Sequence, residues 1–172
     1  DIIAKSSQVG AAKIALEIDS YDLTNGYKRF GLAVPPNINF PSIAYGKINS
    51  RSNISDHEIA SLGFGYGLEA SAIQLAMAFS VFANDGVLKG FQLVEEKNHN
   101  NPSQVISKHT AKLIMESLEQ VIVDGTGSQA KHHSHRVAGK TGTSHKVSNG
   151  KYDKSKYISS FIGIGPLETK KY

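Results

Sequence analysis

The sequence predicts an α+β fold in which helices pack against an antiparallel sheet. Three observations favour this class. Two segments near the C-terminus alternate like strands around an Asn149-Gly150 turn. Apolar residues recur at helical spacing through the middle of the chain. The 172 residues, of which 40% are hydrophobic and 20% charged, suit one globular domain with a core of its own.

Three apolar segments in the first half indicate helices and a loop between them. A helix is expected from about Val9 to Ile18, where apolar side chains form a broad face and Ser6 or Ser7 can cap the start. A second helix is expected from Tyr21 to Phe30 and ends at a glycine. Residues 33–53 contain three prolines and many Asn and Ser residues, which predicts a loop or a pair of short edge strands.

The middle of the chain continues with a turn and two longer helices. Residues 63–67 alternate glycine with large side chains, which predicts a tightly turned backbone. A helix from Ser71 to Ala83 is apolar nearly all round, so we expect it to be buried and to end at residues 84–86. Ser107 is placed to cap a helix through Ile122, and residues 125–135 are expected to form a mobile loop.

The last part of the chain is typical of a β-hairpin. Arg136 to Lys146 is expected as one strand and Tyr157 to Gly165 as the other, joined by the Asn-Gly turn.

Composition excludes several functional classes. The chain has no cysteine, so a disulfide framework, a thiolate zinc site and a cysteine nucleophile are impossible. No stretch approaches the roughly 18–20 apolar residues of a membrane span. The net charge of +4 is mild and the basic residues are dispersed, so we expect no nucleic-acid partner.

The first chemically informative stretch is Lys140-Thr141-Gly142-Thr143 on the first hairpin strand. Glycine within a strand often marks a place where a ligand approaches the backbone closely. A lysine and two threonine hydroxyls beside it suit capture of a peptide carboxylate along a strand edge. The alternative is a solvated lysine and two ordinary strand threonines. A strict pleat places Lys140 and Thr143 on opposite faces, so the spacing alone does not make them converge.

The second informative stretch is Lys5-Ser6-Ser7-Gln8-Val9-Gly10 at the start of the first helix. Its hydroxyl and amide side chains can line a cleft and relay a proton. Simple capping of the helix is the alternative explanation.

These stretches resemble the motifs of penicillin-binding proteins and serine β-lactamases. Lys140-Thr141-Gly142-Thr143 is similar to their third motif, and residues 5–10 are similar to their second, Ser-x-Asn in the context K-S-S-N-V-G. Residues 64–67 followed by 74–76 resemble the F-G-Y-G…Q-L-A segment of class B penicillin-binding proteins, and residues 27–32 match their R-F-G-L. The four motifs occur in the order and at the separations typical of the family, so the resemblance covers the whole chain. Within the family, the sequence is most similar to the division-associated peptidoglycan D,D-transpeptidases.

The resemblance implies a penicillin-binding transpeptidase fold and a serine acyl-transfer activity. In that family a serine of a Ser-x-x-Lys motif attacks the penultimate D-Ala carbonyl of a stem peptide. The resemblance makes Ser6 the second-motif serine that relays a proton to the leaving group, and Lys140 its positively charged partner. Thr141 and Thr143 are then expected to bind the terminal carboxylate. The resemblance also implies that the Thr143 N–H forms part of the oxyanion hole and that Gly142 leaves room for the ligand.

The sequence departs from the family pattern at two points. Gln8 stands where the family has Asn, and its amide reaches about one bond farther. The nucleophile motif is expected roughly fifty residues before the second motif. The two Ser-x-x-Lys matches here, Ser128 to Lys131 and Ser148 to Lys151, lie in a loop and across the hairpin turn, and the family needs one turn of a buried helix.

We therefore interpret residues 1–172 as a partial transpeptidase domain. It starts after the nucleophile motif, ends before the family's last strand and helix, and is expected to be inactive alone. Two other hypotheses stay open: a non-catalytic peptide- or partner-binding module on the same scaffold, and a D,D-carboxypeptidase. A class A β-lactamase is disfavoured, since no convincing general-base Glu lies between the second and third motifs.

Partners and location follow from the same resemblance. We expect stem peptides with a D-Ala-D-Ala end, β-lactam antibiotics and division-machinery membrane proteins as partners. The expected location is the periplasmic side of the bacterial inner membrane, with an anchor helix outside this chain.

We expect no cofactor. His132, His133 and His135 cluster near His145, but adjacent loop histidines should point apart instead of converging on zinc. Residues 56–58, Asp-His-Glu, are more typical of a helix start or a surface turn than of a metal site.

Overall fold

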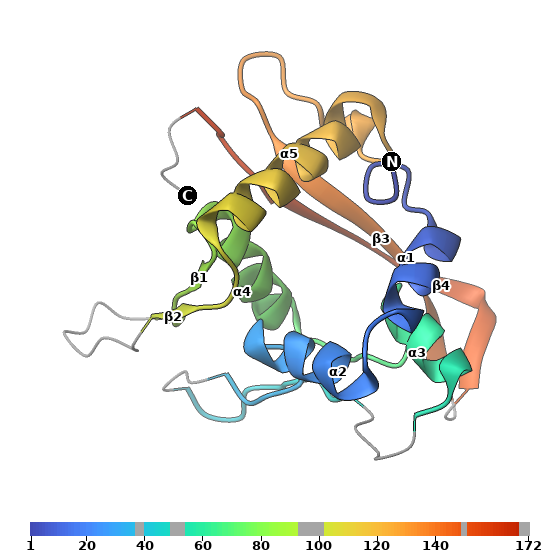
Figure 1. Ribbon diagram of the computed structural model, residues 1–172. Helices are drawn as coiled ribbons and strands as arrows, with labels where there is room; N and C mark the ends of the chain where they lie inside the picture. The colour runs from blue at the N-terminus through green and yellow to red at the C-terminus, as the bar shows by residue number, and fades with distance from the viewer. Residues whose placement is uncertain (37–39, 49–53, 93–101, 149–150, 169–172) are drawn as a thin grey trace. The chain divides into compact units, whose positions relative to one another are not determined.

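The computed structural model describes residues 1–36, 40–48, 54–92, 102–148 and 151–168 (Figure 1). Contacts between Cα atoms divide the chain into two compact units. The helical unit comprises Ile2 and Ser7–Ile114, and the hairpin unit comprises Asp1, Ile3–Ser6 and the chain from Met115 onward. Helices and an antiparallel ribbon are both present, which confirms the predicted α+β class.

The first helix, α1 (Gln8–Leu16), begins where the sequence predicts. The Ser7 hydroxyl accepts a hydrogen bond from the Gly10 N–H at 3.1 Å and caps the helix. The helix ends at Leu16, before the expected Ile18. Its apolar face is largely uncovered, with Val9 68% exposed, because periodicity marks an apolar face without showing what packs on it.

Helix α3 (Asp56–Leu62) confirms that residues 56–58 are a helix start. Ser55 and Glu58 form a reciprocal capping box at its first turn. At its C-terminal end the backbone meets α1 closely, since a Cβ on Gly63 would lie 2.6 Å from the Ala15 Cβ. The glycines at 65 and 67 have φ of +93° and +82°, which confirms the predicted tight turn.

Helices α2 (Ser20–Arg29) and α4 (Ala72–Ala83) also lie where they were predicted. The Tyr27 hydroxyl donates to the Leu62 carbonyl at 2.6 Å, which ties α2 to the end of α3. The expectation that α4 is buried all round is wrong. Ile73 is 36% exposed, whereas Val81 on the same helix is fully buried.

Gln74 on α4 organises the loops of the helical unit. Its side chain is fully buried. Its Oε1 accepts from the Gly46 N–H at 2.9 Å and from the Ser71 N–H at 3.0 Å. Its Nε2 donates to the Gly31 carbonyl at 3.2 Å and the Val34 carbonyl at 2.9 Å. One amide therefore satisfies four backbone groups that are otherwise separated along the chain.

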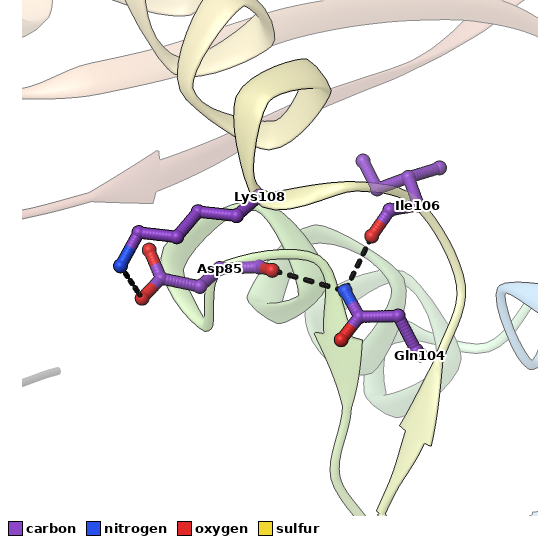
Figure 2. A network of polar contacts seen from close by, with 4 residues as sticks. All are labelled: Asp85, Gln104, Ile106 and Lys108. Atoms are coloured by element: carbon purple, nitrogen blue, oxygen red, sulfur yellow. Dashed lines mark hydrogen bonds and ion pairs between the residues drawn. The ribbon is translucent and has the colours of Figure 1, made fainter.

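Two short strands that the sequence did not predict, β1 (Val87–Leu88) and β2 (Ser103–Gln104), pair after α4. Figure 2 shows the polar contacts beside them. The Gln104 amide donates to the carbonyls of Asp85 and Ile106, and Lys108 pairs with the Asp85 carboxylate at 2.9 Å. Asp85 has φ of +54°, and these contacts hold its turn in place.

The last helix, α5 (Lys108–Asp124), is capped as predicted. The Ser107 hydroxyl accepts from the Thr110 N–H at 3.0 Å. The helix continues to Asp124 instead of ending at Ile122, and it contributes its last turns to the hairpin unit.

Strands β3 (Ala138–Ser148) and β4 (Lys151–Ile164) form the predicted antiparallel ribbon (Figure 1). Lys140 pairs with Ile162, and the register shifts between His145 and Lys146. Strand β4 begins at Lys151 instead of Tyr157, so the ribbon is longer than expected. The Asn149-Gly150 turn lies outside the described residues.

Arg136 joins α5 to the end of the ribbon where β3 begins and β4 finishes, within the hairpin unit. Its guanidinium binds the Glu119 carboxylate with two hydrogen bonds of 2.7 and 2.6 Å. These bonds hold the pKa of Glu119 below its usual value. The backbone N–H of Arg136 donates to the Glu168 carboxylate at 2.7 Å, and the backbone carbonyl of Arg136 accepts from the Leu167 N–H at 3.0 Å. The start of β3 is thereby fixed against the helix and against the segment after β4.

Within the described ranges no helix combines the length and apolarity needed to cross a bilayer.

We predict that Gln74→Met lowers the free energy of unfolding by about 2–4 kcal/mol, because the shape is kept while buried backbone groups lose their partners. Urea denaturation of the chain measures the change. The matched control is Gln120→Met at an exposed position on α5, which should change stability by less than about 0.5 kcal/mol. Equal effects of the two substitutions would contradict the role given to Gln74.

Candidate active site

The N-terminal turn places Ser6 in the hairpin unit. The N–H of Lys5 donates to the Asp1 carbonyl at 2.9 Å, and the N–H of Ser6 donates to the Ile3 carbonyl at 3.2 Å. Ser6 has φ of +53°, which is uncommon for a residue with a Cβ. The Lys5 ammonium holds the turn on the end of α5, donating to the Asp124 carbonyl at 2.6 Å and its carboxylate at 3.2 Å.

A glycine-flanked loop follows α5 and returns to the same turn. A Cβ on Gly125 would lie 2.4 Å from the Ala4 carbonyl oxygen and 2.6 Å from the Val121 Cα, so only glycine fits. The Thr126 N–H donates to the Ala4 carbonyl at 3.3 Å, and the Gly127 N–H donates to the Val121 carbonyl at 2.9 Å. The backbone therefore fixes the position of Thr126.

Lys140 on β3 reaches the hydroxyl of Ser6. Its half-buried ammonium donates to Ser6 Oγ and, at 3.0 Å, to the carbonyl of Thr141. Burial disfavours the charged form and lowers the pKa of Lys140 below its ordinary value. The predicted second-motif serine and third-motif lysine thus meet in one place.

Thr126 joins this contact to the third motif. Its Oγ1 lies 2.7 Å from Thr141 Oγ1 and 3.3 Å from Ser6 Oγ. We call Ser6, Thr126, Lys140 and Thr141 the hydroxyl–lysine cluster. A pleat places Lys140 and Thr141 on opposite faces, but both reach the cluster, since the lysine bends back to the Thr141 carbonyl and the loop meets the Thr141 hydroxyl.

Thr126 is not among the predicted site residues, and its segment is predicted to be a mobile loop. The available signal was the glycine on each side of Thr126, which marks close approach of the backbone.

The other predicted site residues are not members of the hydroxyl–lysine cluster. The Thr143 side chain is exposed, and none of the described residues bonds its hydroxyl. A Cβ on Gly142 would lie 2.6 Å from Ser160 Oγ on β4, so glycine here keeps clear of the neighbouring strand. Gln8 belongs to the helical unit, where it is exposed as the first residue of α1.

Neither Ser-x-x-Lys match has the helical placement that the family requires. Ser128 is exposed in a three-residue 3₁₀ helix, η1 (Ser128–Ala130), and Lys131 after it is extended. Ser148 and Lys151 are cross-strand partners at the end of the ribbon. The expectation that neither pair lies one turn apart on a buried α-helix is confirmed.

The expectation that neighbouring loop histidines point apart is wrong. The His132 ring stacks on His133 with 4.5 Å between centroids and on His135 with 5.1 Å. His145 packs instead against Tyr157 at 4.7 Å. In the described part of the chain, no group of three His, Asp or Glu residues is arranged to hold a metal ion.

Comparison with known proteins places these residues in context. A family model described as the penicillin binding protein transpeptidase domain matches residues 1–172. The peptidoglycan D,D-transpeptidase FtsI of Buchnera aphidicola (subspecies Schizaphis graminum) is 34% identical over 172 residues, covering 99% of this chain and 30% of the relative. PbpC of Pseudomonas aeruginosa, a probable peptidoglycan D,D-transpeptidase, is 33% identical over 166 residues, covering 96% of this chain and 29% of the relative.

A solved structure has the same fold. The apo transpeptidase domain of penicillin-binding protein 3 from Burkholderia pseudomallei superposes with a TM-score of 0.88 at 36% identity. The match covers 96% of this chain and 51% of that one. The chain spans 30% or less of the length of the two curated relatives, FtsI of Buchnera aphidicola and PbpC of Pseudomonas aeruginosa.

We predict that Ser6→Ala lowers the pKa of Lys140 further, because the charged ammonium loses a hydrogen-bond acceptor. An NMR titration of the labelled lysine side chain measures this pKa. Ser7→Ala is the matched control: it should leave the Lys140 pKa unchanged and instead cost about 1 kcal/mol of stability through the lost helix cap. The assignment fails if both substitutions shift the lysine equally.

Proposed function

Because the chain belongs to the penicillin-binding protein transpeptidase family, we propose that it is part of the catalytic domain of a peptidoglycan D,D-transpeptidase that cross-links stem peptides. Residues 1–172 supply the second and third motifs of this domain. The observation that carries the proposal is the contact between the Lys140 ammonium and Ser6 Oγ, two groups separated by 134 positions. It joins the two motifs as serine acyl transfer requires.

The proposed chemistry has two steps. A serine oxygen bonds to the carbonyl carbon of the penultimate D-Ala, the bond to the terminal D-Ala nitrogen breaks, and the serine proton ends on the departing amine. An amine of a neighbouring stem peptide then attacks the ester, regenerates the serine and leaves a new peptide bond.

Ser6 and Lys140 are suited to moving that proton. Lysine has only N–H donors, so Ser6 Oγ accepts from it and the serine keeps its own proton available for donation. The lowered pKa of Lys140 eases the temporary loss of a proton. While Lys140 is protonated, its positive charge favours the negative charge that develops on the substrate carbonyl.

The substrate carboxylate is proposed to bind beside this pair. Thr141 and Thr143 flank Gly142 on β3, and a peptide laid along the strand meets their hydroxyls and backbone N–H groups. The Thr143 N–H is proposed as one donor of the oxyanion hole. Gln8 is proposed to contact the substrate amide, in the role that Asn has elsewhere in the family.

The nucleophilic Ser-x-x-Lys is proposed to come from a part of the protein outside these residues. A longer protein of the FtsI kind would work in septal wall synthesis with division-machinery membrane proteins, on the periplasmic side of the inner membrane. β-Lactams, which mimic the D-Ala-D-Ala end, are its proposed inhibitors.

We predict that Lys140→Ala in the full-length protein slows acylation by a labelled penicillin about 100-fold or more. Stopped-time labelling followed by gel fluorescence measures the rate. Lys146→Ala, at an exposed position on the same strand, is the matched control and should react at the wild-type rate. An unchanged rate for Lys140→Ala would sink the proposed role, and a full-length protein that is never labelled would favour a non-catalytic module.

We also predict that Ser128→Ala and Lys131→Ala leave the amount of penicillin label unchanged. Both residues are exposed around a short 3₁₀ helix, where no helical turn sets the serine on the lysine. Mass spectrometry of labelled peptides identifies the acylated serine directly. Label on Ser128 would overturn the placement of the nucleophile outside these residues.

A further inference from the structure

Thr126 stands between the two motifs on which the proposed function rests. Its Oγ1 is within hydrogen-bond distance of both Ser6 Oγ and Thr141 Oγ1, at 3.3 and 2.7 Å. No motif of the sequence analysis includes it. We infer that Thr126 is a positioning residue that sets the direction of the hydroxyl protons of Ser6 and Thr141 during acyl transfer.

The proposed direction starts from Lys140, the one group in the cluster that can act only as a donor. Lys140 can only donate, so Ser6 Oγ accepts from it. Within the described residues, the remaining hydroxyl partner of Ser6 is Thr126. If Ser6 donates to Thr126, the proton of Thr126 points to Thr141 Oγ1. The proton of Thr141 is then free to point outward to a bound carboxylate.

The two distances give the two bonds different strengths. At 2.7 Å the contact between Thr126 and Thr141 has the usual length of a hydroxyl–hydroxyl hydrogen bond and fixes the Thr141 rotor. At 3.3 Å the contact with Ser6 is longer than usual and therefore weak. In the free enzyme the Ser6 proton is thus oriented toward Thr126. Because that hydrogen bond is weak, little free energy is lost when the proton turns to the leaving amine.

The backbone makes Thr126 suitable for this task. Its N–H bonds the Ala4 carbonyl at 3.3 Å, and the glycine before it allows the loop to touch both the N-terminal turn and α5. Backbone contacts therefore hold the Thr126 hydroxyl near Ser6 and Thr141, independently of neighbouring side chains. The Thr126 side chain is exposed, so its substitution leaves the core unchanged.

The test uses the full-length protein and separates binding of a labelled penicillin from acylation by stopped-flow kinetics. Thr126→Val keeps the shape and removes the hydroxyl, and we expect the acylation efficiency to fall about five- to tenfold, the size of one neutral hydrogen bond. Thr126→Ser keeps the hydroxyl and should restore efficiency to within about twofold of wild type. Thermal melting should be the same for all three proteins.

A double-mutant cycle supplies a readout that a structural role would not move. Thr126→Val should have little further effect in a Thr141→Val background, because the shorter of its two hydroxyl contacts is already gone and the longer contact with Ser6 is weak. The control is Thr110→Val, which removes a similar 2.8 Å hydroxyl–hydroxyl contact with Ser107 at the start of α5 and should leave acylation unchanged.

Three results would overturn the inference: wild-type efficiency in Thr126→Val, equal losses in the Val and Ser variants, or additive losses with Thr141→Val. A wild-type protein that is not acylated at all would instead remove the proposed function, and this inference with it. The wild-type measurement therefore separates failure of the function from failure of the role of Thr126.

Discussion

The candidate site depends on one backbone-to-backbone approach. At Gly125 the loop after α5 lies so close to the Ala4 carbonyl and to Val121 that no side chain fits between them. The N-terminal turn therefore rests directly on the end of a helix that follows it by more than a hundred positions. Ser6 is carried by the turn and Thr126 by the loop, so this approach brings their hydroxyls together.

Strand β3, which carries Lys140, is held in place by an ion pair. Arg136 lies just before β3 and binds the Glu119 carboxylate on α5 through two short hydrogen bonds. Paired bonds of this kind set direction as well as distance. Lys140 follows on the strand that this contact orients, which explains how its flexible side chain meets Ser6. Steric closeness at the loop and ion pairing at the strand thus act on the same helix.

Local sequence predicted the features that local physics decides. Helix starts at Ser7, Ser71 and Ser107 depend on the next three residues, and the ribbon depends on alternation around one turn. The family motifs predicted Ser6 and Lys140 as site residues. Thr126 belongs to none of these motifs, and its local signal was the glycine on each side of it. Its hydrogen-bond partners come from segments 120 and 15 positions away.

Burial was predicted less well than helix position. The apolar faces of α1 and α4 are evident from spacing, but spacing does not show whether another element covers them, and Val9 and Ile73 are exposed. Gln74 shows the opposite case. A polar residue within an apolar helix is fully buried because three backbone groups from distant loops converge on it beside its own N-cap, and their convergence is a property of the tertiary structure.

The β3–β4 ribbon has a consequence for handling the protein. In the described part of the chain it is a two-stranded sheet, so each strand has one edge without a hydrogen-bonded neighbour. Open strand edges can pair with an extended chain, including a strand of another copy of the protein. Large apolar side chains such as Tyr157 and Ile158 are also exposed on β4. The openness that suits a peptide ligand on β3 is therefore also a route to aggregation at high concentration.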